Sequence, residues 1–275
     1  MELLRTQIRI GLDTPVRILH FSDVHLTRAD LRDGDRKVEL ADARYNTFPH
    51  AEEVLQRISA QAKAMDLPLI CTGDLCDFVS EANVEAAREF TDEHDVFAVA
   101  GNHEFSLYVG EAWEDEAYRN QSLDKVQSAY KNNIRMDARV IGGVNFVALD
   151  NGYYLFDEAQ LAFLKAQVAK GLPIVLLCHV PFYDRDLYDF ELARAPGCAY
   201  LTGVPEELMG HYDDHRFRQQ KADAVTQETL DYVAGEPLIR VILTGHLHIN
   251  HEASFAGRIP QIFTGHEALR LIEFI

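Results

Sequence analysis

The sequence has no long apolar run, which bears on membrane insertion. Its longest stretch without Asp, Glu, Lys or Arg runs from Gly171 to Tyr183 and includes a histidine. This stretch is shorter than the roughly 20 apolar residues that a membrane-spanning helix needs. The first residues, Met1 to Arg5, also lack the basic segment and following apolar segment of a secretory signal. We therefore expect a cytoplasmic protein with no membrane partner.

Cysteine and basic residues are both scarce. The cysteines form no C-x-x-C pair and are too few for a disulfide framework, so we expect buried thiols at Cys71, Cys76, Cys178 and Cys198. With 26 Lys and Arg against 44 Asp and Glu, the formal net charge is −18. A surface this acidic repels a phosphate backbone, which disfavours broad nucleic-acid binding. The single tryptophan, Trp113, is expected to be a packing anchor.

What the sequence does contain is a series of short apolar runs separated by segments with helical periodicity. The runs fit buried strands, and they cover 16–21, 67–71, 96–100, 174–178 and 240–243. The periodic segments predict helices over 51–65, 81–91 and 157–169. Alternating residues around Gly142-Gly143 predict a hairpin over 138–150, and 251–275 is expected to form short strands without a helix.

This alternation predicts an α/β fold with a mixed sheet. No linker or shift in composition marks a second domain, so 1–275 is expected to form a single domain. Two charged and irregular segments interrupt the alternation, Thr27 to His50 and Val180 to about Gln219. Structureless stretches of this length are usually functional loops, so we expect insert loops at about 27–50 and 180–219 over the active site.

Each strand-like run is followed at once by a residue that can bind a metal ion. The clusters are Ser22-Asp23-Val24-His25, Gly73-Asp74-Leu75-Cys76-Asp77, Gly101-Asn102-His103-Glu104, His179-Val180-Pro181 and Gly245-His246-Leu247-His248. Because the carboxyl ends of strands form the ligand crevice of an open α/β sheet, these clusters should converge. Any one of them alone is more often a simple turn. Five in order, all at strand ends, are not explained as turns.

The donor atoms of these clusters indicate which metals fit. Oxygen and nitrogen ligands without a thiolate suit Mn, Fe, Zn, Ni or Co. The candidate ligands are Asp23, His25, Asp74, Asn102, His179, His246 and His248. This set is larger than one four- to six-coordinate ion needs, so the sequence implies two metal ions with a carboxylate bridging them.

The order of the five clusters resembles the calcineurin-like metallophosphoesterases, and the resemblance extends from Phe21 to Asn250. It implies a four-layer αββα sandwich with two mixed sheets and a metal site at the C-terminal ends of the strands. It also implies that Asp74 bridges two metal ions, the first held by Asp23, His25 and His248 and the second by Asn102, His179 and His246.

The same resemblance implies a mechanism. A metal-bound hydroxide attacks phosphorus in line, and His103 protonates the leaving alkoxide as general acid. Asp77 orients His103 and keeps it protonated, while the Asn102 amide reaches a phosphate oxygen. The sequence has Phe78-Val79 where protein phosphatases of the superfamily carry Arg-Gly. This departure argues against a Ser/Thr protein phosphatase and favours the bacterial phosphodiesterase and nucleotide-acting type.

Substrate contacts are expected from the 180–219 segment, which begins directly after His179. Its aromatic residues and arginines could stack a base or grip a second phosphate, although a surface excursion explains any one of them equally well; they are Tyr183, Arg185, Tyr188, Arg194, Tyr200, Arg216 and Arg218. Arg185 is the strongest candidate for binding the substrate's negative charge because it lies only six residues after His179. Tyr183 and Tyr188 would then supply a stacking surface.

The function expected from these observations is dinuclear metal-dependent hydrolysis of small phosphoesters, with phosphodiesters or nucleotides as substrates. A nuclease of the same superfamily is an alternative that the net charge disfavours. A metal-free phosphoesterase-like scaffold is a second alternative, disfavoured because every ligand position is filled. Among the other histidines, His211 and His215 are expected in a solvated loop. His266 ends another apolar run and is expected either near the crevice, on the substrate side, or else on the surface or in the core.

Overall fold

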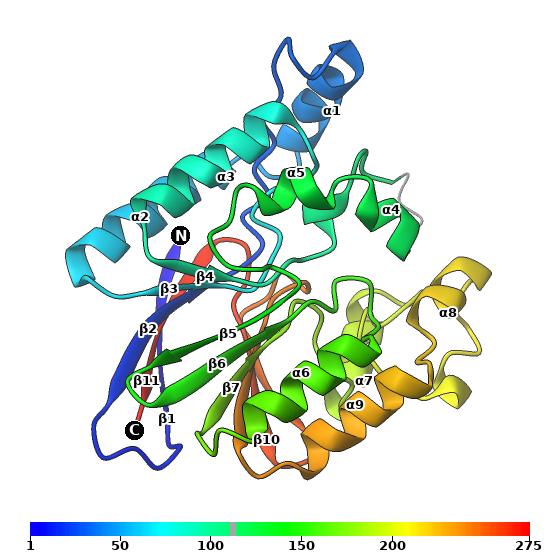
Figure 1. Ribbon diagram of the computed structural model, residues 1–275. Helices are drawn as coiled ribbons and strands as arrows, with labels where there is room; N and C mark the ends of the chain where they lie inside the picture. The colour runs from blue at the N-terminus through cyan, green and yellow to red at the C-terminus, as the bar shows by residue number, and fades with distance from the viewer. Residues whose placement is uncertain (111–113) are drawn as a thin grey trace.

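The computed structural model describes residues 1–110 and 114–275, so the expectation for Trp113 lies outside the described residues. Two mixed β-sheets form the centre of the molecule (Figure 1). The first sheet has the strand order β1-β11-β2-β3-β4, with only the β11–β2 pair antiparallel. Its strands are β1 (Glu2–Ile8), β2 (Val16–Phe21), β3 (Leu69–Cys71), β4 (Val96–Ala98) and β11 (Ala268–Phe274).

The second sheet has the order β5-β6-β7-β8-β10-β9. Its four central strands run parallel to their neighbours, and the outer pairs β5–β6 and β10–β9 are antiparallel. Its strands are β5 (Met136–Ile141), β6 (Val144–Leu149), β7 (Ile174–Leu177), β8 (Ile239–Thr244), β9 (His251–Phe255) and β10 (Ile259–Phe263). The predicted hairpin is the β5–β6 pair, turning at Gly142-Gly143, where both glycines have positive φ.

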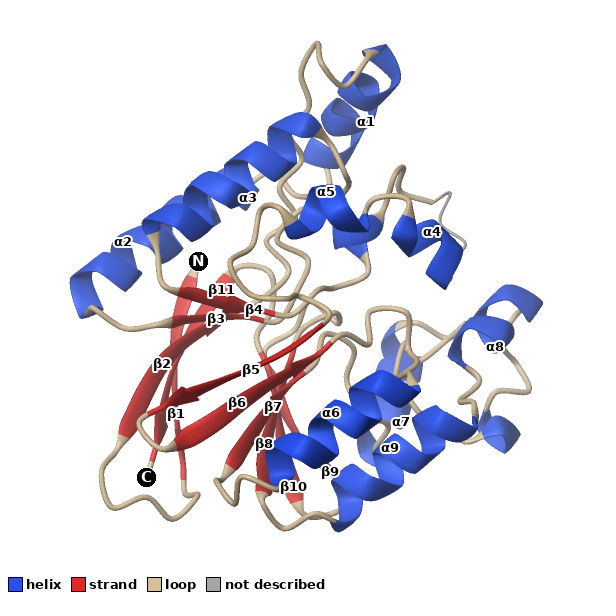
Figure 2. Cartoon of the chain, viewed as in Figure 1, coloured by secondary structure: helices blue, strands red, loops and turns tan. Residues whose placement is uncertain are grey.

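Apolar side chains fill three interfaces between layers. Ile18 and Ile70 of the first sheet meet Phe146 and Val241 of the second in a fully buried core. On the outer face of the first sheet, α2 (Ala51–Met65) and α3 (Glu81–Glu93) complete another core, and α6 (Glu158–Val168) and α9 (Ala224–Gly235) do the same on the second sheet. Figure 2 shows the strands between these two groups of helices. The predicted αββα sandwich with two mixed sheets is confirmed.

Local sequence signals set the ends of the predicted helices. The side chain of Ser80 accepts a hydrogen bond from the Asn83 backbone N–H and starts α3. Asp157 and Gln160 form a capping box at the start of α6. The remaining predicted helix, α2, ends where Asp66 adopts the left-handed conformation. All three helices therefore form within two residues of their predicted bounds.

The two segments expected to be structureless contain helices instead. The first holds α1 (Asp35–Tyr45), and the second holds α7 (Arg185–Arg194), the 3₁₀ turn η2 (Glu206–Leu208) and α8 (Asp214–Gln220). Further elements that the sequence did not indicate are β1, α4 (Glu116–Asn120), α5 (Leu123–Gln127), α9 and the 3₁₀ turn η1 (His103–Phe105). In α1 only Ala41 is buried, so the sequence of this helix has no apolar stripe from which it could be predicted.

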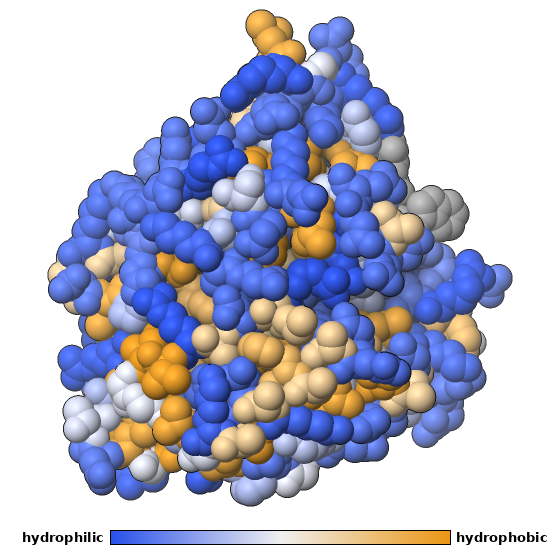
Figure 3. Space-filling model, in the orientation of Figure 1, coloured by the Kyte–Doolittle hydropathy of each residue, from blue (hydrophilic) through white to orange (hydrophobic). Residues whose placement is uncertain are grey.

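The face shown in Figure 3 is mostly hydrophilic, with smaller apolar patches between the charged residues. Large apolar side chains that are exposed among the described residues are Leu3, Leu31, Tyr45, Val140 and Phe190. None of the helices in the described parts of the chain is long and apolar enough to cross a membrane.

Candidate metal centre

The seven candidate ligands lie on loops that leave the carboxyl ends of five strands. Asp23 and His25 follow β2, Asp74 follows β3 and Asn102 follows β4, while β7 and β8 lead to His179 and to His246 and His248. The structure brings all seven side chains together. Asp23, His25, Asp74 and His179 are fully buried or nearly so, whereas 34% of the His248 side chain is accessible.

The backbone carrying these ligands is strained. Non-glycine residues rarely adopt positive φ, yet five of the candidate ligands do so, with φ of 55° at Asp23, 54° at His25, 54° at Asp74, 68° at His246 and 54° at His248. Each such residue costs about 1–3 kcal/mol and persists only where the surrounding structure demands it. Strain concentrated on potential ligands therefore indicates a functional site.

Two of the glycines that precede these ligands are required by close packing. A Cβ atom on Gly73 would lie 2.5 Å from the backbone nitrogen of Gly101, and φ at Gly73 is 97°. A Cβ atom on Gly101 would in turn overlap the Asp74 carboxylate. Only glycine lets the loops after β3 and β4 approach closely enough to place Asp74 and Asn102 side by side.

One group of ligand atoms forms around Asp23, His25 and His248. The Nε2 atoms of the two histidines are 2.9 Å apart, and Oδ1 of Asp23 lies 3.9 Å from the first and 3.6 Å from the second. The Nδ1 atom of His25 donates to Asp77 Oδ1 at 2.9 Å, which turns its Nε2 atom toward the group.

A second group forms around Asp74, His179 and His246. Nε2 of His179 lies 3.1 Å from Oδ2 of Asp74, 3.2 Å from Nδ1 of His246 and 3.2 Å from Oδ1 of Asn102. The Nδ1 atom of His179 donates to the Thr72 carbonyl at 2.7 Å. Histidines held in this way by a partner on the other ring nitrogen are typical of metal ligands.

The electrostatics of the two groups fit a metal site. Burial raises the pKa of Asp23 to about 7, in spite of the opposing charge of His179. Burial also lowers the pKa of His248 to about 2, with a further lowering from His25. The imidazole of His248 is thereby held neutral, which is the form that coordinates a metal ion. Burial tends to lower the pKa of His179, but the charge of Asp74 outweighs this effect and raises that pKa to about 10, so the buried carboxylates draw positive charge to the second group as well. A metal cation would supply that charge, so these residues fit one.

His103 and Asp77 lie beside these groups, and His103 offers a ring nitrogen within 4.8 Å of ligand atoms of His25 and Asp74. Nδ1 of His103 donates to the Asp77 carbonyl at 2.7 Å and lies 3.2 Å from Oδ1 of the Asp77 carboxylate. Burial lowers the pKa of His103, but the charges of Asp74 and Asp77 outweigh this effect and raise that pKa to about 9. An imidazolium oriented in this way can donate a proton to a leaving group.

A family model for calcineurin-like phosphoesterases matches residues 16–250, which is most of the chain. The chain belongs to the calcineurin-like phosphoesterase family. The family predicted from the order of the five clusters is confirmed.

Solved structures with a similar chain course include other phosphoesterases. A dimetal phosphatase from Danio rerio is 14% identical with a TM-score of 0.48, over 91% of this chain and 88% of its own. A phosphopantetheinyl hydrolase from Mycobacterium tuberculosis is 11% identical with a TM-score of 0.46, over 93% of this chain and 92% of its own. A 5′-nucleotidase precursor from Thermus thermophilus is 13% identical with a TM-score of 0.43, over 92% of this chain and 48% of its own. The chain thus spans about half the length of the 5′-nucleotidase chains. Comparison with curated proteins finds no match.

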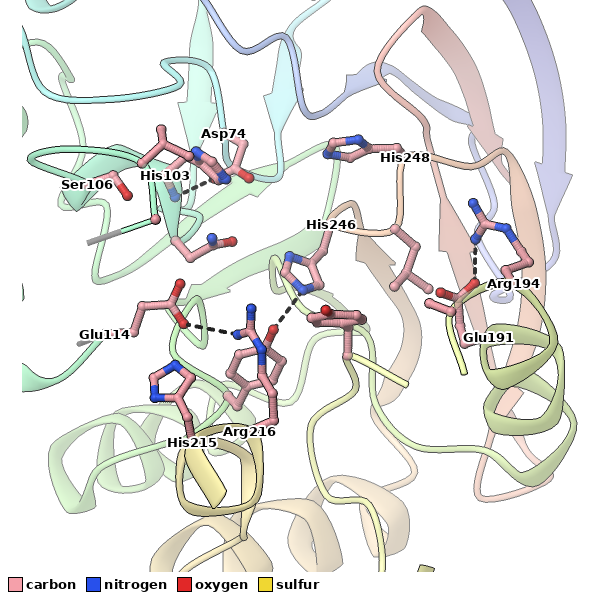
Figure 4. Close-up of a pocket in the computed structure, with 17 residues that line it drawn as sticks. Asp74, His103, Ser106, Glu114, Glu191, Arg194, His215, Arg216, His246 and His248 are labelled. Atoms are coloured by element: carbon pink, nitrogen blue, oxygen red, sulfur yellow. Dashed lines mark hydrogen bonds and ion pairs between the residues drawn. The ribbon is translucent and has the colours of Figure 1, made fainter. Parts of the chain in front are cut away.

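A cavity of about 640 Å³ opens onto the candidate ligands of this calcineurin-like phosphoesterase (Figure 4). The 180–219 segment lines part of it, as expected, through Arg194, Tyr200 and Arg216. The three residues favoured from the sequence are elsewhere. Arg185 is an exposed side chain paired with Asp189 on α7, Tyr183 lines a different hollow, and Tyr188 is buried with its hydroxyl on the Leu208 carbonyl. The helix α7 carries Arg185 away from the cavity, which corrects that expectation.

Several residues that shape the site of this phosphoesterase escaped the sequence analysis. Glu104 is buried and accepts backbone N–H groups from the loops after β3 and β4, and Arg44 of α1 donates two hydrogen bonds to the Asp77 carboxylate. The Tyr154 hydroxyl lies 3.1 Å from Nε2 of His246. Glu104 belongs to the cluster Gly101-Asn102-His103-Glu104, but the sequence did not indicate that its side chain is buried. Nothing in the local sequence ties Arg44 or Tyr154 to the site.

The remaining histidines are also placed. The ring of His266 lies 5.4 Å from that of His248, near the crevice, although it does not line the cavity. His215 lines the cavity, whereas His211 is exposed beside Tyr212. The described residues of the 211–215 stretch form no metal-ligand group.

Proposed function

We propose that this protein is a dinuclear metal-dependent hydrolase of small phosphoesters, with phosphodiesters or nucleotides as substrates. The observation that carries the proposal is the position of Asp74 Oδ2, 3.1 Å from His179 Nε2 of one ligand group and 3.7 Å from His25 Nε2 of the other. A carboxylate oxygen facing both groups is placed to bridge two cations. Asp23, His25 and His248 would hold one cation, and Asn102, His179 and His246 would hold the other.

Two bound cations would supply Lewis acidity toward a phosphate oxygen and lower the pKa of a water molecule toward neutrality. The chain's own residues would position the proton donor and the phosphate. Oδ1 of Asp74 accepts the His103 backbone N–H at 2.8 Å, so the bridging carboxylate and the proton donor are fixed to one another. The side chain of Asn102 lines the cavity, where its amide N–H₂ can reach a phosphate oxygen.

His103 would protonate the departing alkoxide. Its Nδ1–H is engaged by the Asp77 carbonyl, which leaves Nε2 as the ring nitrogen that can carry a proton to the substrate. Asp77 itself receives two hydrogen bonds from Arg44. Burial tends to raise the pKa of Asp77, but the bonds from Arg44 and His103 outweigh this effect and lower that pKa. Asp77 therefore stays charged and favours the protonated form of His103.

The environment of Phe78 supports the choice of small phosphodiesters or nucleotides over phosphoproteins. Phe78 is fully buried, and Val79 beside it is nearly so. The position at which protein phosphatases of the superfamily carry their phosphate-binding arginine thus presents no cation to the cavity. The cavity's own arginines, Arg194 and Arg216, are each within 4 Å of a carboxylate. A nuclease remains the alternative, disfavoured by the net charge of −18.

Metal analysis and a substrate panel test the proposal. The purified protein would be loaded with Mn²⁺, freed of excess ion, and analysed by plasma emission, then assayed on bis(p-nitrophenyl) phosphate, p-nitrophenyl phosphate, cyclic nucleotides and plasmid DNA. We expect two ions per chain and hydrolysis of the small diesters or nucleotides that chelation abolishes and Mn²⁺ restores. A protein that binds no metal and cleaves none of these compounds would be a scaffold, and cleavage of DNA alone would identify a nuclease.

A further inference from the structure

The cavity contains a charged pair that the proposed chemistry does not use. Glu114 and Arg216 point toward one another across the cavity, below His246 in the view of Figure 4. Nη1 of Arg216 lies 3.9 Å from Oε2 of Glu114, which is too long for a hydrogen bond. Oε2 of Glu114 is buried and has no hydrogen-bond partner among the described residues. The Glu114 carboxylate therefore offers an unpaired acceptor that faces the Arg216 donor without a hydrogen bond between them.

Arg216 is held in place by other contacts. Its guanidinium lies over the Tyr200 ring at 5.0 Å, and Nη1 donates to Gln219 Oε1 at 2.6 Å. The Tyr200 ring is in turn 6.2 Å from the ring of His246. Arg216 is thus held on the wall that continues from the candidate metal ligands into the cavity, and in this position its Nη1 atom lies 3.9 Å from Oε2 of Glu114.

Glu114 is equally close to the reaction centre. Its carboxylate interacts with the side chain of Asn102, whose Oδ1 atom is 3.2 Å from His179 Nε2. One side chain therefore separates Glu114 from the ligand group around Asp74. Glu114 and Arg216 line the same cavity as Asp74 and His246, so the alcohol part of a substrate whose phosphate binds at this group has room to reach the pair.

The chemistry of the pair selects its ligand. A phosphate or carboxylate accepts from Arg216 but is repelled by Glu114, and an ammonium group donates to Glu114 but is repelled by Arg216. A hydroxyl group both donates and accepts, so it satisfies both partners at once. We propose that the Glu114–Arg216 pair binds a hydroxyl group on the alcohol part of the phosphoester, as found in ribose or glycerol. This inference rests on the proposed phosphoesterase function of the neighbouring site.

Matched substrates with and without the hydroxyl groups test the inference on the Mn²⁺-loaded enzyme. The four probes are the p-nitrophenyl esters of AMP, 2′,3′-dideoxy-AMP, glycerol 3-phosphate and propyl phosphate, all with the same leaving group. We expect the wild type to prefer at least one hydroxyl-bearing ester over its partner by about tenfold or more in kcat/KM, because the partner leaves Glu114 unsatisfied. The pair that shows the preference identifies ribose or glycerol as the source of the hydroxyl.

Variants of the two residues locate the effect. Glu114→Ala and Arg216→Ala should lose most of the preference, so that their kcat/KM falls much further on the hydroxyl-bearing esters than on the hydroxyl-free ones. Glu114→Gln, which keeps the side-chain volume, should lose part of it. The exposed Glu116 and Arg218 do not line this cavity, so Glu116→Ala and Arg218→Ala should retain the full preference. Thermal unfolding would verify that each variant is folded.

The outcomes separate the inference from the function on which it rests. Hydrolysis of all four esters without a preference for the hydroxyl-bearing ones would overturn the inference alone. An equal loss on both members of each ester pair in Glu114→Ala or Glu114→Gln would also overturn it, because the residue would then act on the reaction as a whole. If none of the four esters is hydrolysed, the inference fails. The proposed function fails with it only if p-nitrophenyl phosphate, bis(p-nitrophenyl) phosphate and the cyclic nucleotides are not hydrolysed either.

Discussion

At the scale of single residues, Asp74 is the side chain on which the two ligand groups depend. Its Oδ2 atom faces both groups and its Oδ1 atom accepts the His103 backbone N–H. Asp74→Ala leaves the histidines of two groups without their shared anion. We expect loss of at least one metal ion per chain and of nearly all activity, measured by plasma emission and by hydrolysis of bis(p-nitrophenyl) phosphate.

The control for this variant is Asp92→Ala, which removes an exposed carboxylate far from the cavity. This variant should keep the metal content and turnover of the wild type. Two metal ions per chain and normal turnover in Asp74→Ala would contradict the assignment of Asp74 as a bridge.

His103 should behave differently because it is proposed to carry a proton rather than a metal ion. His103→Ala should keep its metal content, while kcat falls by about 10²–10⁴ for an ester with a poor leaving group. The loss should shrink as the leaving group becomes more acidic, since such a group departs without a proton. A series of aryl and alkyl esters would measure this dependence, with the exposed His50→Ala as control. The same loss across the whole series would refute the general-acid role.

At the scale of structural elements, Glu104 ties together the loops that leave β3 and β4. Its buried carboxylate accepts the backbone N–H groups of Asp74, Leu75 and Gly101, and also the Tyr130 hydroxyl at 3.2 Å. Glu104→Ala leaves these backbone donors buried and unpaired, so we expect a loss of about 3 kcal/mol or more in the free energy of unfolding. Tyr130→Phe removes only one of the bonds and should cost about 1 kcal/mol.

Urea unfolding of the two variants in the presence of a chelator would measure the difference. Chelation removes the effect of metal binding on stability, so the loop anchoring alone is compared. Equal stability losses in Glu104→Ala and Tyr130→Phe would show that the backbone bonds to Glu104 do not hold these loops.

The elements differ in how far the sequence predicted them. The helix α2 was predicted with its bounds because Val54, Leu55 and Ile58 form a buried face at helical spacing. The helix α1 has no such face, and its stabilising contacts are tertiary: Arg44 donates to the Asp77 carboxylate and Lys37 donates to the Val79 carbonyl. A helix stabilised by contacts distant in sequence leaves no periodic signal in its own residues.

The same contrast applies to the site. The candidate ligands were predictable because each directly follows a buried strand, and sheet topology then brings the strand ends together. Which of the aromatic residues and arginines of the 180–219 segment line the cavity could not be predicted, because their positions depend on the course of the chain between α7 and α8. Arg185 lies close to His179 in sequence but faces solvent at the first turn of α7, whereas Arg216 of α8 returns to the cavity. Distance along the chain was therefore a poor guide to distance from the site.

At the scale of the whole molecule, His20 links the two sheets. This fully buried side chain of β2 lies 2.9 Å from the Thr72 hydroxyl after β3 in the first sheet and 2.8 Å from the Thr264 hydroxyl after β10 in the second. Burial, with a smaller effect of Arg270, lowers the pKa of His20 from 6.5 to about 3. The neutral imidazole is thus the form that holds the sheets together.

The stability of the protein should therefore fall in acid in part through His20. Because the folded-state pKa lies below the unfolded-state value, the unfolded chain binds the extra proton between pH 6.5 and about 3. The contribution of His20 is present above pH 6.5 and is lost as the pH falls, at up to about 1.4 kcal/mol per pH unit. His20→Gln loses the imidazole contacts to Thr72 and Thr264, so its unfolding free energy in urea with chelator should lie below that of the wild type at pH 8. The variant side chain does not titrate, so this difference depends on pH only through the wild type. At pH 4.5 the difference between the two unfolding free energies should be smaller by about 2.7 kcal/mol. Parallel pH profiles for the two proteins would show that His20 is not held neutral in the folded state.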